Sequence, residues 1–245
     1  MRILVVNVNT TESMTAAIGK QAQAAASPGT EIIALTPRFG AESVEGNFES
    51  HLAAVAVMDA VSTYPEPFDA VIQAGFGEHG REGLQEIVDV PVVDITEAAA
   101  ILAMLVGRSY SVVTTLDRTV PMIEDRLTVA GLFDRCASVR ASDVPVLALE
   151  EDPDLAVTAI VAEAEKAVRE DRAEVICLGC GGMAGLDERI KSQCGVPVID
   201  GVTAAVTLAE SLVALGLSTS KVRTYAAPRP KRIIGWPIST AIAAQ

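Results

Sequence analysis

Aromatic residues are scarce in this 245-residue sequence, at 4% of the chain, although 50% of all residues are hydrophobic. The core must therefore be built mainly from Val, Ala, Leu and Ile, a composition that suits parallel strands covered by helices. Basic residues are also in deficit, because 32 Asp and Glu outnumber 19 Lys and Arg and leave a formal net charge of -13. This balance argues against nucleic acid as a partner, since a duplex binder needs basic side chains to displace counterions.

Features of secreted and membrane proteins are missing too. The four cysteines lack the regular spacing of a disulfide framework, and the first residues form a strand pattern rather than a secretory leader. We therefore expect reduced thiols and a cytoplasmic protein. The longest apolar stretches, such as Ala98 to Val106, fall short of the roughly 20 residues that span a bilayer, so no membrane role is expected.

Short apolar segments alternate with Ala-rich amphipathic segments along the chain. The apolar segments are rich in β-branched residues and polar only at their edges, which is typical of buried parallel strands, and their alternation with helices predicts a doubly wound α/β fold. We expect strands at Arg2–Val6, Glu31–Leu35, Ala70–Gln73, Val90–Val93, Tyr110–Thr114, Glu174–Leu178 and Val196–Ile199. We expect helices at Thr11–Ala25, Phe48–Ser62, Leu155–Glu170 and Thr203–Leu215.

An internal echo divides the chain in two. Residues Asp89–Ala99 and Gly195–Ala205 are identical at six of eleven positions, and an apolar strand with a glycine-rich turn precedes each of them. Two α/β units can share this pattern by chance, or the chain can contain a duplication. A duplication predicts two pseudo-symmetric Rossmann-like lobes with parallel sheets. The glycine-rich turns then face each other across a cleft, where ligands bind beyond the carboxyl ends of the strands.

Cys180 stands at the end of a predicted strand and is followed by Gly181 and Gly182. The glycines let a ligand approach the thiol, and nearby amide dipoles can lower its pKa toward neutrality, which makes Cys180 a candidate proton carrier. A buried structural cysteine is the alternative, and Cys177, inside the strand, fits that role. The Cys177-x-x-Cys180 spacing predicts neither a zinc site nor a thioredoxin-like site. It has no second ligand pair and does not begin a helix.

Polar turns follow two of the other predicted strands. Asn7, Asn9 and Thr10 follow the first strand, and Thr114 and Thr115 end the strand that begins at Tyr110. Such residues can cap a helix, or they can hold a polar ligand. A third turn, residues 75–80, matches the G-x-G-x-x-G spacing of dinucleotide sites, a weak signal when it stands alone.

These motifs together resemble the aspartate/glutamate racemase superfamily, and most closely its hydantoin and allantoin racemase branch. The resemblance spans nearly the whole chain, and the Leu-Gly-Cys-x-Gly-Met signature around Cys180 is its most specific part. The matching segments are Asn7–Thr11, Val44–Gly46, Phe76–Gly80, Val113–Arg118, Leu178–Met183, Pro197–Gly201 and Thr219–Lys221.

The resemblance implies a cofactor-independent isomerase in which two cysteines, one per lobe, exchange a proton at a carbon of a small-molecule substrate. Cys180 matches the cysteine of the second lobe, whereas the matching position of the first lobe is Gly75. His79 or Glu78, on the same turn, can supply the missing acid or base, and water can reprotonate an acidic hydantoin carbon. We therefore predict Cys180 and His79 as catalytic residues. The predicted substrate-binding residues are Asn9, Glu45, Gly75, Phe76, Gly77, Thr114, Thr115, Gly181 and Gly182.

The resemblance also implies no metal, no cofactor and a homo-oligomer, with residues 1–98 and 208–245 in the first lobe and 99–207 in the second. Two alternatives to the racemase stay open. Arylmalonate decarboxylases look like this fold with glycine in the first slot and cysteine in the second, and a single cysteine protonates their enediolate. A cleft that only binds a small amide or carboxylate is the other alternative.

Overall fold

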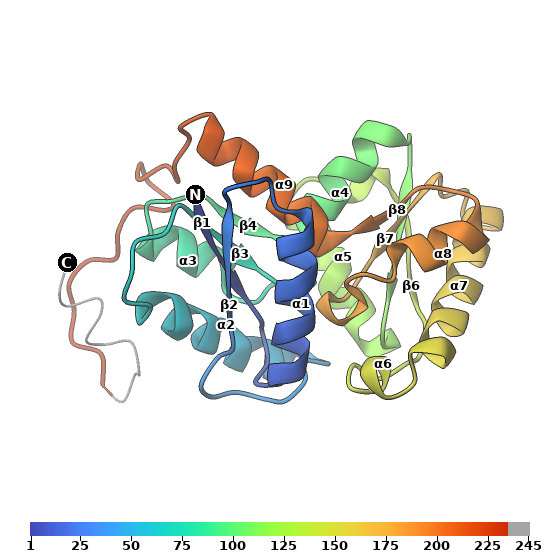
Figure 1. Cartoon of the computed structure of the whole chain (residues 1–245), viewed down its shortest axis with the longest axis horizontal. Coiled ribbons are helices and arrows are strands. Elements are labelled where there is room, and N and C mark those ends of the chain that lie inside the picture. Colours follow the sequence, from blue (N-terminus) through green and yellow to red (C-terminus); the bar gives the residue numbers. More distant parts are fainter. Residues whose placement is uncertain (235–245) are drawn as a thin grey trace.

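The chain folds into two α/β lobes that lie side by side (Figure 1), in a computed structural model that describes residues 1–234. Every strand pair is parallel. The first sheet has the order β2-β1-β3-β4 and the second β6-β5-β7-β8, so the two lobes match strand for strand and the predicted architecture is confirmed. The strands are β1 (Arg2–Val6), β2 (Glu31–Leu35), β3 (Ala70–Gln73), β4 (Val92–Asp94), β5 (Tyr110–Thr114), β6 (Cys136–Ala141), β7 (Val175–Leu178) and β8 (Val198–Asp200).

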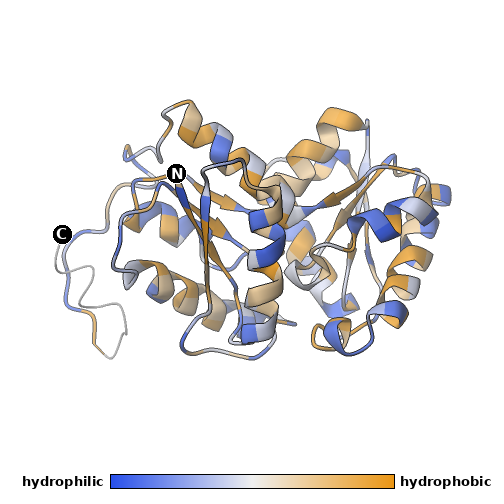
Figure 2. Ribbon diagram, viewed as in Figure 1, coloured by the Kyte–Doolittle hydropathy of each residue, from blue (hydrophilic) through white to orange (hydrophobic). Residues whose placement is uncertain are grey.

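Helices cover the sheets, and the apolar strands lie beneath them, as the hydropathy colouring of Figure 2 shows. The helices are α1 (Glu12–Ala25), α2 (Asn47–Ser62), α3 (Arg81–Ile87), α4 (Ile95–Val106), α5 (Val120–Val129), α6 (Ala148–Glu151), α7 (Pro153–Arg169), α8 (Asp187–Cys194) and α9 (Gly201–Ala214). Short 3-10 turns are η1 (Asp117–Thr119), η2 (Phe133–Arg135) and η3 (Gly181–Met183). Within residues 1–234, no helix combines the length and apolarity that crossing a membrane requires.

The sequence prediction missed β6, began β7 one residue too early at Glu174 and misplaced the starts of β4 and β8 by two residues. β6 lies at the edge of its sheet and is only partly buried along its length, so it lacks the continuous apolar run of a central strand. β4 and β8 begin after Pro91 and Pro197, two residues later than predicted. A proline has no N–H to donate to a neighbouring strand, which explains the later starts.

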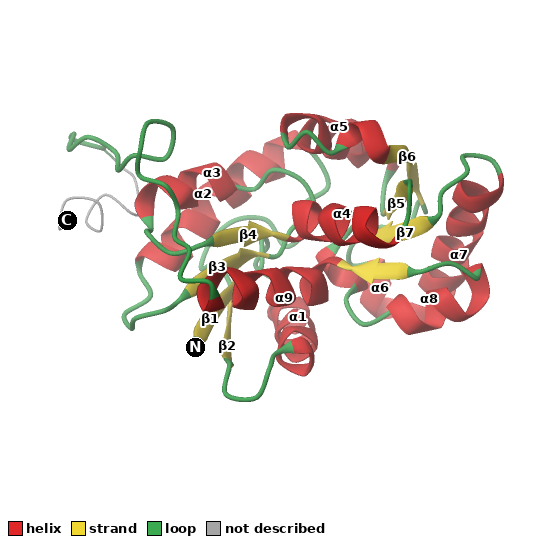
Figure 3. Cartoon of the chain, turned by 90° about the horizontal axis from the view of Figure 1, so that it is seen from above, coloured by secondary structure: helices red, strands yellow, loops and turns green. Residues whose placement is uncertain are grey.

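Helices α4 and α9 pass between the lobes (Figure 3). Each begins at an aspartate of the internal echo: Asp94 accepts hydrogen bonds from the first backbone N–H groups of α4, and Asp200 does the same for α9. α4 then packs against β7 of the second sheet, α9 packs against β3 of the first sheet, and the two helices contact each other. Because each helix packs against the sheet of the other lobe, the pair of helices holds the carboxyl ends of the two sheets together. The division of the chain at residues 98/99 and 207/208 stays a proposal.

The difference between central and edge strands can be tested with one matched pair of variants. We expect Ile72→Ala in β3 to lower the free energy of unfolding by about 4 kcal/mol, because Ile72 is fully buried and leaves a cavity. Ile33→Ala in the edge strand β2, where the side chain is only partly buried, should cost roughly 1–2 kcal/mol. Urea denaturation measures both values. Equal losses would contradict the assignment of β3 as core and β2 as edge.

Candidate active site

A cavity of about 40 Å³ lies where the carboxyl ends of the central strands of both sheets meet. The turns after β1, β3, β5 and β7 all contribute to its wall, as expected for parallel α/β sheets. Its wall is formed by Asn7, Val8, Asn9, Met14, Val44, Ala74, Gly75, Phe76, His79, Thr114, Thr115, Thr119, Met122, Val146, Gly179, Cys180, Gly181 and Gly182.

Cys180 brings its thiol to this cavity from the second lobe. It precedes η3, and its sulfur accepts a hydrogen bond from the backbone N–H of Gly182 at 3.4 Å. Burial raises the pKa of Cys180 to about 11, although the Gly182 N–H acts in the opposite direction. The prediction of a near-neutral thiol is therefore wrong for this structure, because desolvation outweighs the amide dipole. Cys180 carries its proton at neutral pH and is ready to donate it.

Gly75 occupies the equivalent place in the first lobe, the second residue after β3, as Cys180 is the second residue after β7. A Cβ at Gly75 would lie 2.5 Å from the Cδ2 atom of His79 and 2.5 Å from a methyl group of Val8. No real Cβ contact is that short. The ring of His79 therefore fills the space that a side chain at position 75 would need, on the same cavity wall.

His79 is buried, with 2% of its surface exposed. Burial lowers the pKa of its ring to about 4, so the imidazole is neutral at neutral pH and can accept a proton. Its Nδ1 lies 3.0 Å from the hydroxyl of Ser50 on α2, and its Nε2 lies 3.4 Å from the carbonyl oxygen of Phe76.

These two contacts indicate which ring nitrogen carries the proton. The Ser50 hydroxyl donates its single hydrogen to the backbone oxygen of Glu78 at 2.6 Å, which leaves its oxygen as an acceptor for Nδ1–H of His79. The Nε2 contact with Phe76 is long for a hydrogen bond. This arrangement favours the ring form with its proton on Nδ1, in which Nε2 carries the lone pair on the side of the Gly75–Gly77 turn.

Most other predicted binding residues also reach the cavity. Asn9 uses its side-chain oxygen within its own turn, whereas among the described residues its amide group donates only to the sulfur of Met14. Thr114 donates to the Gly179 oxygen at 3.1 Å and so joins the turns of β5 and β7. The Thr115 hydroxyl makes no hydrogen bond within residues 1–234 and lines the cavity.

Two predicted binding residues lie outside the cavity wall. The Glu45 carboxylate instead accepts a hydrogen bond from the backbone N–H of Val146 at 3.0 Å, which links the two lobes beside the cavity. Gly77 has a φ of 123° and donates to Thr96, so it shapes the turn rather than facing a ligand. The structure adds Thr119 and Ser50, which the sequence did not single out because a lone hydroxyl side chain carries no distinctive spacing, and it places Asn7 of the first polar turn on the cavity wall.

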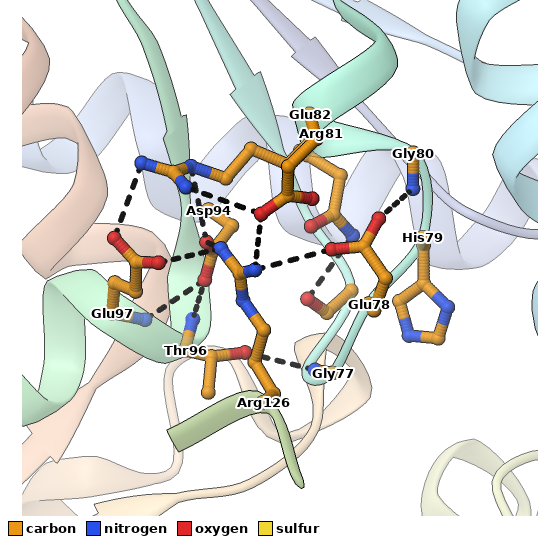
Figure 4. Close-up of polar contacts among 12 residues, drawn as sticks. Gly77, Glu78, His79, Gly80, Arg81, Glu82, Asp94, Thr96, Glu97 and Arg126 are labelled. Atoms are coloured by element: carbon orange, nitrogen blue, oxygen red, sulfur yellow. Dashed lines mark hydrogen bonds and ion pairs between the residues drawn. The ribbon is translucent and has the colours of Figure 1, made fainter. Parts of the chain in front are cut away.

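An ion cluster lies behind the turn that carries His79 (Figure 4). Its centre is Arg126 of α5, whose side chain is 3% exposed. The guanidinium pairs with four carboxylates of the first lobe and of the start of α4, and Arg81 pairs with three of them. The carboxylates are Glu78, Glu82, Asp94 and Glu97. Arg126 gave no sequence signal, because its partners are brought together only by the fold.

Comparison with known proteins shows the same fold and extends over nearly the whole chain. The family model described as Asp/Glu/hydantoin racemase matches residues 3–209. A hydantoin racemase from Rhizobium meliloti is 42% identical over 236 residues, which covers 96% of this chain and 98% of the relative. An allantoin racemase structure from Pseudomonas fluorescens is 75% identical with a TM-score of 0.95 and covers 96% of this chain and 100% of that one. One from Klebsiella pneumoniae is 42% identical with a TM-score of 0.94, covering 98% of each chain.

The close fit between Gly75 and His79 predicts a measurable coupling between the two positions. Gly75→Ala should lower the free energy of unfolding by about 1–3 kcal/mol, since the new methyl group overpacks the cavity wall. In a His79→Ala background the same substitution should cost at least about 0.5 kcal/mol less, because one of its clashing neighbours is gone. Denaturation of the four proteins in a double-mutant cycle measures this. Strict additivity would show that the ring does not occupy the space beside Gly75.

Proposed function

Because the chain belongs to the Asp/Glu/hydantoin racemase family, we propose that it racemises 5-substituted hydantoins or related cyclic ureides, with His79 and Cys180 as the two proton-transfer groups. The observation that carries this proposal is the pairing, in one cavity, of a neutral imidazole from the first lobe with a protonated thiol from the second. The chain is an enzyme of the racemase class, like its relatives.

The proposed reaction moves one proton off and one proton onto the same carbon. His79 Nε2 takes the proton from the stereocentre, whose C–H is acidified by the neighbouring carbonyl, and the electron pair moves to that carbonyl oxygen as an enolate. The Cys180 thiol then protonates the carbon from the opposite face, which leaves an imidazolium and a thiolate. After the product leaves, the imidazolium gives its proton to water and the thiolate takes a proton from water, which restores the starting forms; the other enantiomer reacts by the same steps in reverse.

Backbone N–H groups beside the reacting pair support stabilisation of the enolate. The N–H groups of Gly75 and Phe76 make no hydrogen bond within residues 1–234, and both residues line the cavity. Preorganised donors of this kind stabilise a developing oxyanion strongly where water is excluded. The hydroxyl of Thr115 and the amide of Asn9 are further donors for the ring carbonyl groups of a ureide.

The charge of the cavity favours a neutral substrate. Within residues 1–234, its wall contains no Lys, Arg, Asp or Glu side chain. A buried carboxylate without a cationic partner is costly, because it loses its hydration without compensation. A neutral ureide ring avoids that cost, whereas a substituted malonate would depend on hydroxyl and N–H donors alone.

One observation favours a second candidate function, the decarboxylation of substituted malonates. Gly75 leaves the cavity with a single cysteine, and a decarboxylase needs one acid only: loss of CO2 produces the enediolate that Cys180 would protonate. The pairing with His79 and the uncharged wall place this candidate second. A homo-oligomeric assembly and a cytoplasmic location also stay predictions of the sequence.

Solvent deuterium exchange tests the proposed function. Each enantiomer of several 5-substituted hydantoins, incubated with the protein in deuterated water, should lose optical rotation and gain deuterium at the stereocentre. Cys180→Ser and His79→Asn should each slow both signals by roughly 10²–10⁴-fold, the usual contribution of a general acid or base.

Cys194→Ser is the matched control for the loss of a thiol, because Cys194 is also half-buried but lies on α8 outside the cavity. It should retain the wild-type rate within about twofold, as surface substitutions usually do. An arylmalonate supplied in parallel distinguishes the candidates. Release of CO2 without any exchange of the hydantoins would replace the racemase proposal with the decarboxylase.

The pH dependence of kcat/KM follows from the forms of the two groups that start the reaction. The neutral ring of His79 is lost below a pH of about 4 and the protonated thiol of Cys180 is lost above about 11. We therefore expect a plateau between these limits once the ionisation of the substrate itself is corrected for. Because two enantiomers have equal free energy, kcat/KM and its plateau must be the same for both. A bell with limbs near the ordinary histidine and cysteine pKa values would contradict this assignment.

A further inference from the structure

Arg126 reaches from the second lobe into the turn that carries His79. It lies on α5, which follows β5 and precedes β6 of the second sheet along the chain, and its side chain is 3% exposed. Its Nη1 donates to Glu78 at 3.2 Å, and its Nη2 donates to Asp94 at 2.8 Å. Glu78 is the residue next to His79, so a buried cation of one lobe contacts the immediate neighbour of a site residue of the other (Figure 4).

Both ends of the Gly77–Gly80 turn are held by acceptors that this guanidinium organises. Gly80 N–H donates to the second oxygen of the Glu78 carboxylate at 2.7 Å. Gly77 N–H donates to the hydroxyl of Thr96 at 2.8 Å, and the N–H of Thr96 in turn donates to Asp94 at 2.8 Å. Arg126 therefore bridges the two anchors of the turn.

The backbone preference of the turn does not by itself fix its shape. Gly77 and Gly80 have φ values of 123° and 94°, a region that only glycine occupies at low cost, and glycine has no intrinsic preference for it. A Cβ on Gly80 would lie 2.8 Å from the backbone oxygen of Ala54 on α2, so the turn also packs tightly against that helix. External hydrogen bonds must select one conformation, and the position of the His79 ring depends on it.

We propose that Arg126 is a positioning residue for the reaction: by holding Glu78 and Asp94 together from the opposite lobe, it fixes the Gly77–Gly80 turn and places His79 at the cavity. The guanidinium reaches Glu78 and Asp94 only when the two lobes are packed together. The placement of His79 therefore depends on the relative position of the lobes. The catalytic part of this inference depends on the proposed role of His79.

A proton on Glu78 does not undo this arrangement. Burial and the neighbouring Glu82 raise the pKa of Glu78 above its ordinary value. The oxygen that accepts from Gly80 remains an acceptor when the carboxyl group is protonated. The contact with the turn therefore persists over the plateau expected for the reaction.

The test uses Glu78→Ala with Glu82→Ala as its matched control. Arg126→Ala is unsuitable, because it leaves the buried carboxylate of Asp94 without its closest cation and can prevent folding. Glu78 and Glu82 both pair with Nη1 of Arg126, and their side chains are 45% and 39% exposed. Only Glu78 also binds the backbone of the turn, so the pair separates positioning from loss of charge.

Amide hydrogen exchange of the 74–80 segment and steady-state kinetics are the two measurements. Glu78→Ala should speed exchange in this segment and lower kcat by tenfold or more with a smaller change in KM, whereas Glu82→Ala should change each by less than about threefold. Equal effects of the two variants, or normal exchange in Glu78→Ala, would overturn the proposal. If Glu78→Ala alone loosens the turn but the wild-type protein exchanges no hydantoin proton, the positioning role stands and the proposed function fails.

Discussion

The site depends on the space that Gly75 leaves open. A side chain there would collide with the ring of His79, so the histidine and a side chain at position 75 exclude each other within this backbone. The two lobes have the same strand order, and their equivalent turns hold a glycine in one and a cysteine in the other. The architecture is therefore symmetric, whereas the cavity at its centre is lined by an imidazole from one lobe and a thiol from the other.

Burial sets the resting protonation state of that pair. Burial disfavours the charged form of any group, so it lowers the pKa of His79 and raises that of Cys180. Both groups are therefore uncharged at neutral pH, and the proposed reaction uses one as a base and the other as an acid. In the proposed reaction, proton transfer through the substrate creates opposite charges in the same cavity, where their attraction is stronger than in water.

Charge is concentrated instead on the far side of the His79 turn. Four carboxylates and two guanidinium groups lie there, and the carboxylates come from the turn after β3, from α3 and from the start of α4. Such a cluster contributes specificity more than stability, because each buried charge offsets its pairing energy with lost hydration. In this cluster the specificity concerns position. A guanidinium has a fixed planar fork of donors, so it defines where Glu78 and Asp94 lie relative to each other.

The amino-acid sequence by itself determined the alternation of strands and helices, the duplicated lobe and the place of Cys180, because hydrophobic periodicity and glycine-rich turns are local patterns. It did not reveal the edge strand β6, whose partial burial removes the apolar signal. Only the tertiary structure decided that His79 fills the space beside Gly75, that Glu45 binds Val146 rather than the cavity, and that Arg126 meets Glu78. Local sequence patterns could not give the pKa of the Cys180 thiol either, because the residues that desolvate it come from both lobes. Each of these contacts joins residues that are distant in the chain or depends on side-chain packing, and no spacing in the sequence encodes such a meeting.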